Sequence, residues 1–253
     1  MRLAACAGAG TSRVAPTVDM PPARTRRRVS VGVRLPGCAV MSGPRIESGK
    51  SQRKRSILPG RSVCHTRVMI EPDTPRFADV ALREGSLVLR PPVVADVPAI
   101  VRSCRDALTQ RWLPLSDPYD ESHAREFVTL GAETTWRSGD GVVRAIEHDG
   151  AFAGMIDLKK TSWRGRTTEI GYWVAPEHRG RGLAARAARL LGDWALRDQG
   201  MERVEIRAAT GNLGSQRAAL AAGYREEGVL RSAGFVHGGR VDLVVFGKVR
   251  ADL

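Results

Sequence analysis

The stretch 169-EIGYWVAPEHRGRGLAARAARLLGDWAL-196 decides the fold of this chain. It opens with aromatic and β-branched residues, which predict a strand over Thr167–Val174. It closes with apolar residues at helical spacing, which predict an amphipathic helix that stops before Gly200. The turn between them holds two arginines and two glycines. Because the first N–H groups of a helix lack internal partners and its dipole favours negative charge there, the turn predicts an anion site suited to a diphosphate.

The residues of this turn fit such a site. Gly180 and Gly182 let the backbone approach a ligand without a Cβ in the way. Arg179 and Arg181 add positive charge at the rim. A Walker A loop is excluded because no Gly-Lys-Ser/Thr follows, and a dinucleotide fingerprint because the Gly-x-Gly-x-x-Gly spacing is absent. Taken alone, such a turn is more often a solvated basic loop, and that alternative stays open here.

The segments around this stretch alternate between short apolar runs and longer amphipathic ones, which is typical of an α+β or mixed α/β domain. The further candidate strands are Ser86–Pro91, two arms of a hairpin turning at His148–Gly150, Met201–Ala209, Tyr224–Leu230 and Arg240–Val249. The further candidate helices are Ala95–Leu108, Tyr119–Trp136 and Ser215–Gly223.

Helical spacing also predicts which residues face the core. In the helix after the glycine turn, the shared apolar face consists of Leu183, Ala187, Leu190, Leu191 and Trp194. The helix within Tyr119–Trp136 is capped by Asp120 or Ser122, with Phe127 and Leu130 on its apolar side. Three tryptophans, Trp112, Trp136 and Trp163, are expected to line either the core, the alternative we favour, or a substrate groove.

The net charge of +13 is concentrated at the N-terminus. Residues 1–68 hold 14 Lys and Arg against two acids, whereas residues 69–253 hold 26 against 25. The leader lacks any sustained periodicity, so we expect residues 1–75 to be disordered and residues 80–253 to form one domain. We favour the hypothesis that the natural chain begins at Met69. The alternative is that residues 1–68 form a basic segment that binds nucleic acid or an anionic membrane. The nearly neutral domain itself is therefore not expected to bind nucleic acid.

Cysteine usage and hydropathy restrict the class further. Three of the four cysteines lie in the leader and only Cys104 lies in the domain, so neither a disulfide framework nor a metal site is expected. No apolar run approaches the length of a membrane span. We therefore expect a cytoplasmic protein that holds no metal.

Two motifs resemble a known family. Arg179-Gly180-Arg181-Gly182-Leu183-Ala184 matches the Arg/Gln-x-x-Gly-x-Gly/Ala signature of the GNAT superfamily of N-acetyltransferases. Asn212-Leu213-Gly214-Ser215 and the later "AAGY" resemble elements of its RimJ/RimL-type subgroup of ribosomal-protein N-terminal acetyltransferases. The resemblance covers Ser86 to Lys248. It implies a mainly antiparallel central sheet of six to seven strands flanked by helices.

The resemblance also implies a binding site for acetyl-coenzyme A. The cofactor would lie where the strands of Tyr172–Val174 and Val204–Ile206 splay apart. Backbone groups of Trp173 and Val174 would hold the pantetheine arm and polarise the thioester, and the side chain of Asn212 would reach the same arm. The pyrophosphate would lie on the backbone of Arg179, Gly180, Arg181, Gly182, Leu183 and Ala184.

Acetyl transfer needs a base for the ammonium and an acid for the departing thiolate. Glu169 is the candidate base, although a structural strand glutamate is an equal alternative. Many relatives place a tyrosine acid where this chain has Ala219, which leaves Ser215 or Tyr224. Ser215 is also expected to cap its helix, and Tyr224 is equally expected in the core.

The predicted reaction is transfer of acetyl to a primary amine by direct attack in a ternary complex. A protein N-terminus is the leading acceptor. The alternatives are a small amine, such as an aminoglycoside, an amino acid or a polyamine, and a sensor that binds acyl-coenzyme A without catalysis. The protein is expected to be a monomer or a homodimer.

Overall fold

The computed structural model describes residues 74–253. The predicted leader ends at residue 75, so its expected disorder and the expected start at Met69 lie outside the described residues, apart from Thr74 and Pro75.

The described residues form an alternation of strands and helices close to the one predicted. The strands are β1 (Leu82–Glu84), β2 (Leu87–Arg90), β3 (Val142–His148), β4 (Ala151–Ser162), β5 (Thr167–Val174), β6 (Arg203–Ala209), β7 (Arg225–Val236) and β8 (Gly239–Val249). The α-helices are α1 (Val97–Cys104), α2 (Ala107–Trp112), α3 (Glu121–Glu126), α4 (Ala132–Arg137), α5 (Leu183–Arg197) and α6 (Leu213–Ala221). A π-helical segment, η2 (Phe127–Gly131), joins α3 to α4. Short 3-10 turns are η1 (Val94–Asp96), η3 (Pro176–His178) and η4 (Arg250–Asp252).

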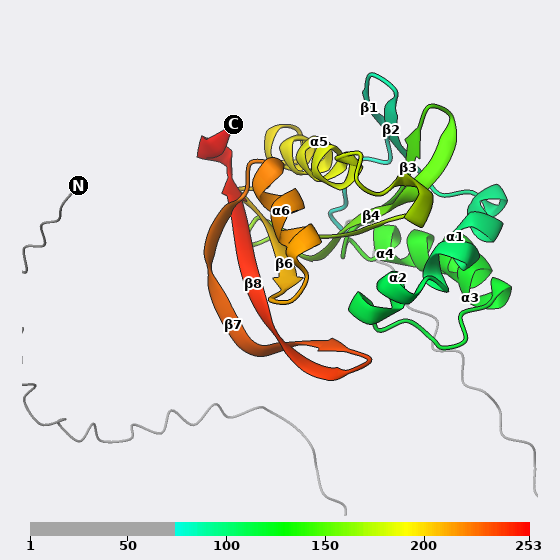
Figure 1. Cartoon of the computed structure of the whole chain (residues 1–253). Helices are drawn as coiled ribbons and strands as arrows, with labels where there is room; N and C mark the ends of the chain where they lie inside the picture. The colour runs from blue at the N-terminus through cyan, green and yellow to red at the C-terminus, as the bar shows by residue number, and fades with distance from the viewer. Residues whose placement is uncertain (1–73) are drawn as a thin grey trace, which may run out of the picture. The chain divides into compact units, whose positions relative to one another are not determined.

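All of these strands join one sheet in the order β1-β2-β3-β4-β5-β6-β8-β7 (Figure 1). Neighbours are antiparallel except β5 and β6, which pair in parallel from Thr167↔Arg203 to Ile170↔Ile206. The mainly antiparallel sheet is as predicted, but it has eight strands rather than six or seven. The strand missing from the prediction is β1, whose three residues are too few to show an alternating pattern.

Helices cover both faces of the sheet (Figure 1). On one face, α5 and α6 pack on alternate sheet residues such as Ile156, Ile170 and Ile206. On the other, α1 and α3 pack on Val143, Ala145 and Met155. Because successive strand residues point to opposite faces, one sheet supplies both cores.

Helix α5 presents the predicted apolar face. Leu183, Ala187, Leu191 and Trp194 are buried, and Leu190 packs against the same core. Gly200 follows the helix with φ +73°, in the left-handed region that glycine adopts without strain. The apolar face of α5 therefore packs closely on the sheet, and this packing fixes the position of the helix N-terminus.

Gly192, in the middle of α5, has no room for a side chain. A Cβ at this position would stand 2.1 Å from the buried Oη of Tyr224. We expect Gly192→Ala to lower the melting temperature by about 3–8 °C, because overpacking costs about 1–3 kcal/mol. Adding Tyr224→Phe removes the clashing oxygen and is expected to restore part of the loss. A thermal melt of the single and double variants checks this, and an unchanged or raised melting temperature for Gly192→Ala would contradict it.

The helix after Tyr119 differs from its prediction. Asp120 caps α3 as expected, since its carboxylate accepts from the His123 N–H at 3.1 Å. Phe127 and Leu130 were predicted to face the core, but they are 37% and 60% exposed. Ala124 and Val128 are buried instead. The prediction failed because small Ala124 gave no strong hydrophobic signal and the π-helical segment η2 departs from regular helical spacing.

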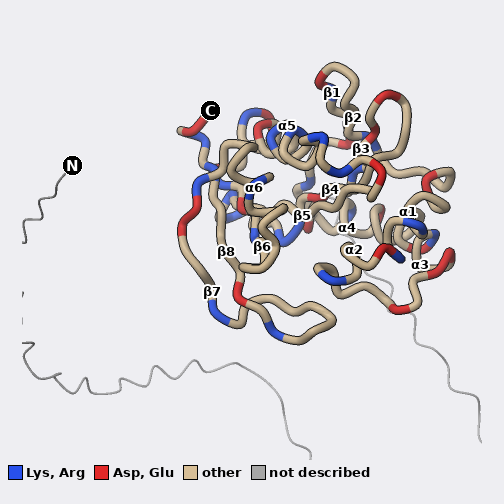
Figure 2. Tube along the Cα trace, in the orientation of Figure 1, with Lys and Arg blue, Asp and Glu red and all other residues tan. Residues whose placement is uncertain are grey.

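Lys and Arg are interspersed with Asp and Glu along the described trace (Figure 2). Ion pairs join them between elements, as where Arg186 and Arg189 of α5 reach Glu84 of β1 at 3.2 and 3.1 Å. Within residues 74–253, none of the helices is both long and apolar enough to cross a membrane.

Candidate active site

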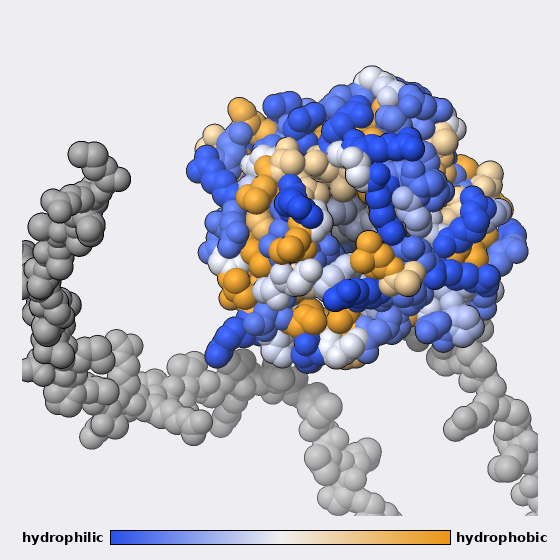
Figure 3. All heavy atoms as spheres, in the orientation of Figure 1, coloured by the Kyte–Doolittle hydropathy of each residue, from blue (hydrophilic) through white to orange (hydrophobic). Residues whose placement is uncertain are grey.

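A cleft of about 1040 Å³ lies at the carboxyl end of β5. It is lined by β4, β5, β6, the start of α5, α2, α6 and the β7–β8 hairpin. The hollow on the face shown in Figure 3 is bordered by both hydrophobic and hydrophilic side chains. A cleft of this size accommodates a large cofactor together with a second substrate.

The start of α5 forms one end of the cleft. Gly180 and Gly182 have φ of +76° and +72°, and a Cβ at either position would meet no described atom within 4 Å. The first hydrogen bond of the helix runs from the Arg186 N–H to the Gly182 carbonyl at 3.1 Å. The N–H groups of 180–185 donate no backbone hydrogen bond to the other described residues. Unpaired N–H groups, open space and the positive end of a helix are the elements of an anion site.

Arg179 has a different position from the one predicted. Its Nη2 donates to the Asp106 carboxylate at 2.6 Å and to the Thr109 hydroxyl at 2.8 Å, and its Nε donates to the Val174 carbonyl at 3.2 Å. Burial raises the pKa of Asp106, but the hydrogen bonds from Arg179 and Thr109 and the charge of Arg179 together outweigh it, so the pKa is lowered overall. Arg179 therefore ties α2 to the end of β5 rather than extending its charge over the glycine turn. The exposed Arg181 makes no ion pair with the described residues.

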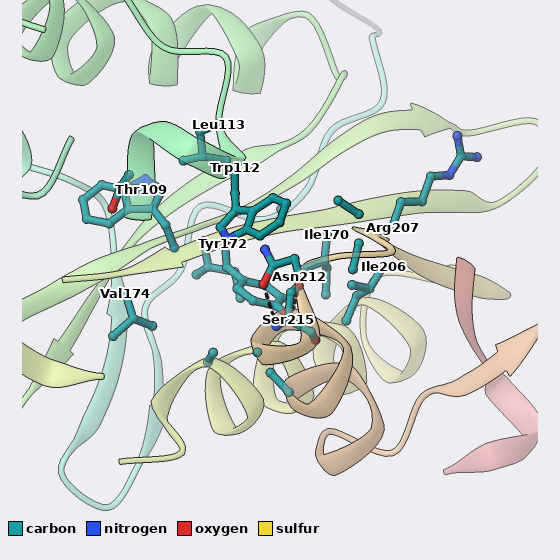
Figure 4. Close-up of a pocket in the computed structure, with 18 of the residues that line it drawn as sticks. Thr109, Trp112, Leu113, Ile170, Tyr172, Val174, Ile206, Arg207, Asn212 and Ser215 are labelled. Atoms are coloured by element: carbon teal, nitrogen blue, oxygen red, sulfur yellow. Dashed lines mark hydrogen bonds between the residues drawn. The ribbon is translucent and has the colours of Figure 1, made fainter. Parts of the chain in front are cut away.

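The middle of the cleft is the place where β5 and β6 separate. Their pairing ends at Ile170↔Ile206, while β5 continues beside β4 through Trp173 and Val174. Trp112 lies over this opening, close to Tyr172 and Asn212 (Figure 4). Trp112 therefore lines the cleft, whereas Trp136 and Trp163 pack against the core as predicted.

The side chains of Asn212, Ser215 and Tyr172 meet at this opening (Figure 4). Asn212 is the N-cap of α6, and its Oδ1 accepts from the Ser215 N–H at 3.1 Å. Ser215 was predicted to be that cap, but the helix begins at Leu213, so Ser215 lies within its first turn. The Ser215 hydroxyl is instead 3.0 Å from the hydroxyl of Tyr172.

Tyr172 is the residue of the site that sequence reasoning missed. Burial raises the pKa of its hydroxyl, and the hydrogen bond with Ser215 acts against the shift. Strand alternation could have placed Tyr172 on the same face as Ile170. Its pairing with Ser215, across a separation of 43 residues, had no signal in a single sequence.

Glu169 lies on the opposite face of β5 from Tyr172 and also lines the cleft. Its side chain is nearly buried, and it is surrounded by cations: Lys160 at 3.0 Å, Arg207 at 3.6 Å and Lys159 at 3.8 Å. Two consecutive lysines reach one carboxylate because β4 is irregular between Lys159 and Ser162, where Lys160 has φ +52°.

Tyr224 is in the core and is not among the residues that line the cleft. It is 2% exposed, and its ring lies under the Lys248 ammonium, 5.8 Å from the ring centroid. Burial is the main cause of the raised pKa of its hydroxyl. Of the two candidate acids, only Ser215 therefore meets the cleft.

The sequence is similar to that of known acetyltransferases. Residues 86–225 match the family described as Acetyltransferase (GNAT) domain. The chain is 31% identical over 143 residues to the "Putative ribosomal N-acetyltransferase YdaF" of Bacillus subtilis (strain 168), covering 56% of this chain and 78% of that protein. It is 27% identical over 96 residues to the "Ribosomal-protein-serine acetyltransferase" of Escherichia coli (strain K12), covering 38% of this chain and 54% of that protein.

Solved structures share the fold. A structure named "Probable acetyltransferase" superposes with a TM-score of 0.63 at 26% identity, over 69% of this chain and 99% of that one. The structure of Mycobacterium smegmatis RimJ in complex with CoA-disulfide superposes with a TM-score of 0.61 at 25% identity, over 69% and 88%. With the family match spanning more than half of the sequence, the chain belongs to the GNAT acetyltransferase family and is an acetyl-CoA-dependent acetyltransferase.

Proposed function

We propose that this enzyme acetylates the N-terminal amine of a protein, by direct attack in a ternary complex. The main support for this proposal is the apolar border of the cleft near the point where β5 and β6 separate. Three apolar side chains from separate elements line it while remaining exposed: Leu108 at 47%, Phe127 at 37% and Phe235 at 62%. Such a border suits an extended peptide better than a small, strongly hydrated amine. The names of the Bacillus and Escherichia relatives favour a ribosomal protein.

The residues at the start of α5 would hold the donor. Acetyl-CoA supplies the acetyl group as a thioester. The backbone of Gly180, Gly182, Leu183 and Ala184 would bind its diphosphate, with the exposed Arg181 adding charge. Backbone groups of Trp173 and Val174 would hold the pantetheine arm, and an N–H near Val174 would donate to the thioester oxygen.

Two side chains, Glu169 on β5 and Ser215 on α6, would carry out the two proton transfers. Glu169 would take the proton of the acceptor ammonium, directly or through water. The Ser215 hydroxyl, bonded to Tyr172, would return a proton to the coenzyme A thiolate. The amide nitrogen of Asn212, whose oxygen is occupied by the helix cap, would be left to bind the pantetheine arm.

A comparison of acceptors tests this proposal. Peptides differing in their N-terminal residue are assayed beside an aminoglycoside, free amino acids and a polyamine, with release of free thiol as the readout. We expect kcat/KM for the best peptide to exceed that of every small amine by at least about tenfold, or about 1.4 kcal/mol. The same peptide with a blocked N-terminus and a free lysine is the control. A small amine as the fastest acceptor would overturn the proposed acceptor, and binding of coenzyme A without any turnover would favour the sensor.

A further inference from the structure

The cleft contains a second carboxylate, Asp157 on β4, that the roles above leave unused. Asp157 is paired with Gly171 of β5, and Lys159 with Glu169, so Asp157, Lys159 and Glu169 share one face of the sheet. All three line the cleft. Asp157 therefore lies on the same face as the candidate base, two residue pairs nearer to the carboxyl end of β5.

The missing side chain of Gly171 gives Asp157 its position. A Cβ on Gly171 would stand 2.6 Å from Asp157 Oδ1 and 2.3 Å from Lys159 Nζ. Both side chains therefore lie across β5 in the space that glycine leaves. The Gly171 N–H donates to Asp157 Oδ1 at 2.9 Å, immediately after the last paired residue of β5 and β6. The carboxylate is thus fixed beside the opening between these strands.

The carboxylate of Asp157 can accept a further charge-assisted hydrogen bond. Its nearest cation, Lys159 Nζ, is 3.8 Å away, longer than a charge-assisted hydrogen bond. Glu169, in contrast, has a lysine at 3.0 Å and two further cations. The same Lys159 ammonium is 3.8 Å from Glu169. The two carboxylates thus attract an alkyl ammonium, and Lys159 leaves Asp157 without a close ion pair, which an acceptor ammonium has the charge to form.

We propose that Asp157 binds the ammonium of the acceptor amine and presents it to Glu169. This assignment rests on the proposed function. Asp157 would contribute binding, and Glu169 would contribute the removal of the proton. Burial raises the pKa of Asp157, so its charge, and with it the binding of an ammonium, is lost at a higher pH than for an ordinary aspartate. The charged groups facing it are Lys159 on β4, Glu169 on β5 and Asp140 before β3.

Two substitutions separate this role from a structural one. Asp157→Asn keeps an oxygen for the Gly171 N–H but removes the charge, whereas Asp157→Glu keeps the charge and displaces that oxygen. At saturating acetyl-CoA, we expect Asp157→Asn to raise the peptide KM at least about tenfold with kcat within about threefold. Asp157→Glu is expected to stay nearer to wild type in KM. If Asp157 only satisfies the Gly171 N–H, the order of the two variants reverses.

The pH profile gives a second readout. In the wild type the peptide KM is expected to rise as the pH falls through the raised pKa of Asp157, and Asp157→Asn is expected to lack this rise. Asp140→Asn, which removes a nearby charge outside the cleft lining, is the matched control and should leave KM within about twofold. An active wild type with an unchanged KM in Asp157→Asn, or with a loss confined to kcat, would overturn this inference alone. A wild type that acetylates no amine would overturn the proposed function as well.

Discussion

Replacing Gly182 by aspartate is expected to raise the Kd for coenzyme A by at least about thirtyfold, or about 2 kcal/mol. Gly182 is the N-cap of α5, and aspartate is a favoured N-cap residue. Its carboxylate would accept from the N–H groups that the diphosphate needs and would repel the diphosphate itself. The helix should therefore persist while the anion site is lost. Isothermal titration with coenzyme A measures the effect.

Gly150 offers a matched control for this substitution. It lies in the turn between β3 and β4 with φ +76°, and a Cβ there would also meet open space. Gly150→Asp imposes a similar backbone strain away from the cleft, so its Kd should remain within about twofold of wild type. If Gly182→Asp bound coenzyme A as well as Gly150→Asp, the start of α5 would not be the diphosphate site.

Replacing Glu169 by glutamine is expected to lower kcat by about 10²–10⁴-fold, the usual contribution of a general base. The amide keeps the shape of the side chain but cannot take a proton. The Kd for coenzyme A should stay close to wild type, because the diphosphate end of the cleft is unchanged. Single-turnover kinetics at saturating peptide and acetyl-CoA measure the chemical step.

Glu205→Gln is the control for the lost charge. Glu205 pairs with Glu169 across β5 and β6 and shares Arg207 with it, at 2.9 Å from Glu205 and 3.6 Å from Glu169, but it does not line the cleft. Its substitution removes a charge from the same cluster of cations and should leave kcat within about threefold. Equal losses in both variants would mean that Glu169 serves the ion-pair network rather than catalysis.

The features that could be predicted from the sequence are those set by residues close together in the chain. The glycine turn, the strand before it and the apolar face of α5 depend on neighbours within a few residues, and periodicity reports such neighbours directly. The positive φ values of Gly180 and Gly182 follow from the same turn. The family motif then identified the anion that the turn suits.

The features that the sequence could not predict depend on contacts between residues far apart in the chain. Arg179 is held by Asp106, 73 residues away, so its charge is used inside the structure. The meeting of Tyr172 with Ser215 and the position of Asp157 beside Gly171 depend on strand register and on the separation of β5 and β6. The register is set by the whole sheet, which a motif does not encode.

The most direct test of the account follows both products of one reaction. Wild-type protein, acetyl-CoA and the best peptide are mixed, and free thiol and N-terminally acetylated peptide are measured together by thiol titration and mass spectrometry. Direct transfer predicts equal amounts of both, with no acetyl group on the protein and with both products reduced at least about thirtyfold for Gly182→Asp at subsaturating acetyl-CoA. Thiol release without acetylated peptide, or acetyl groups accumulating on the protein, would contradict it.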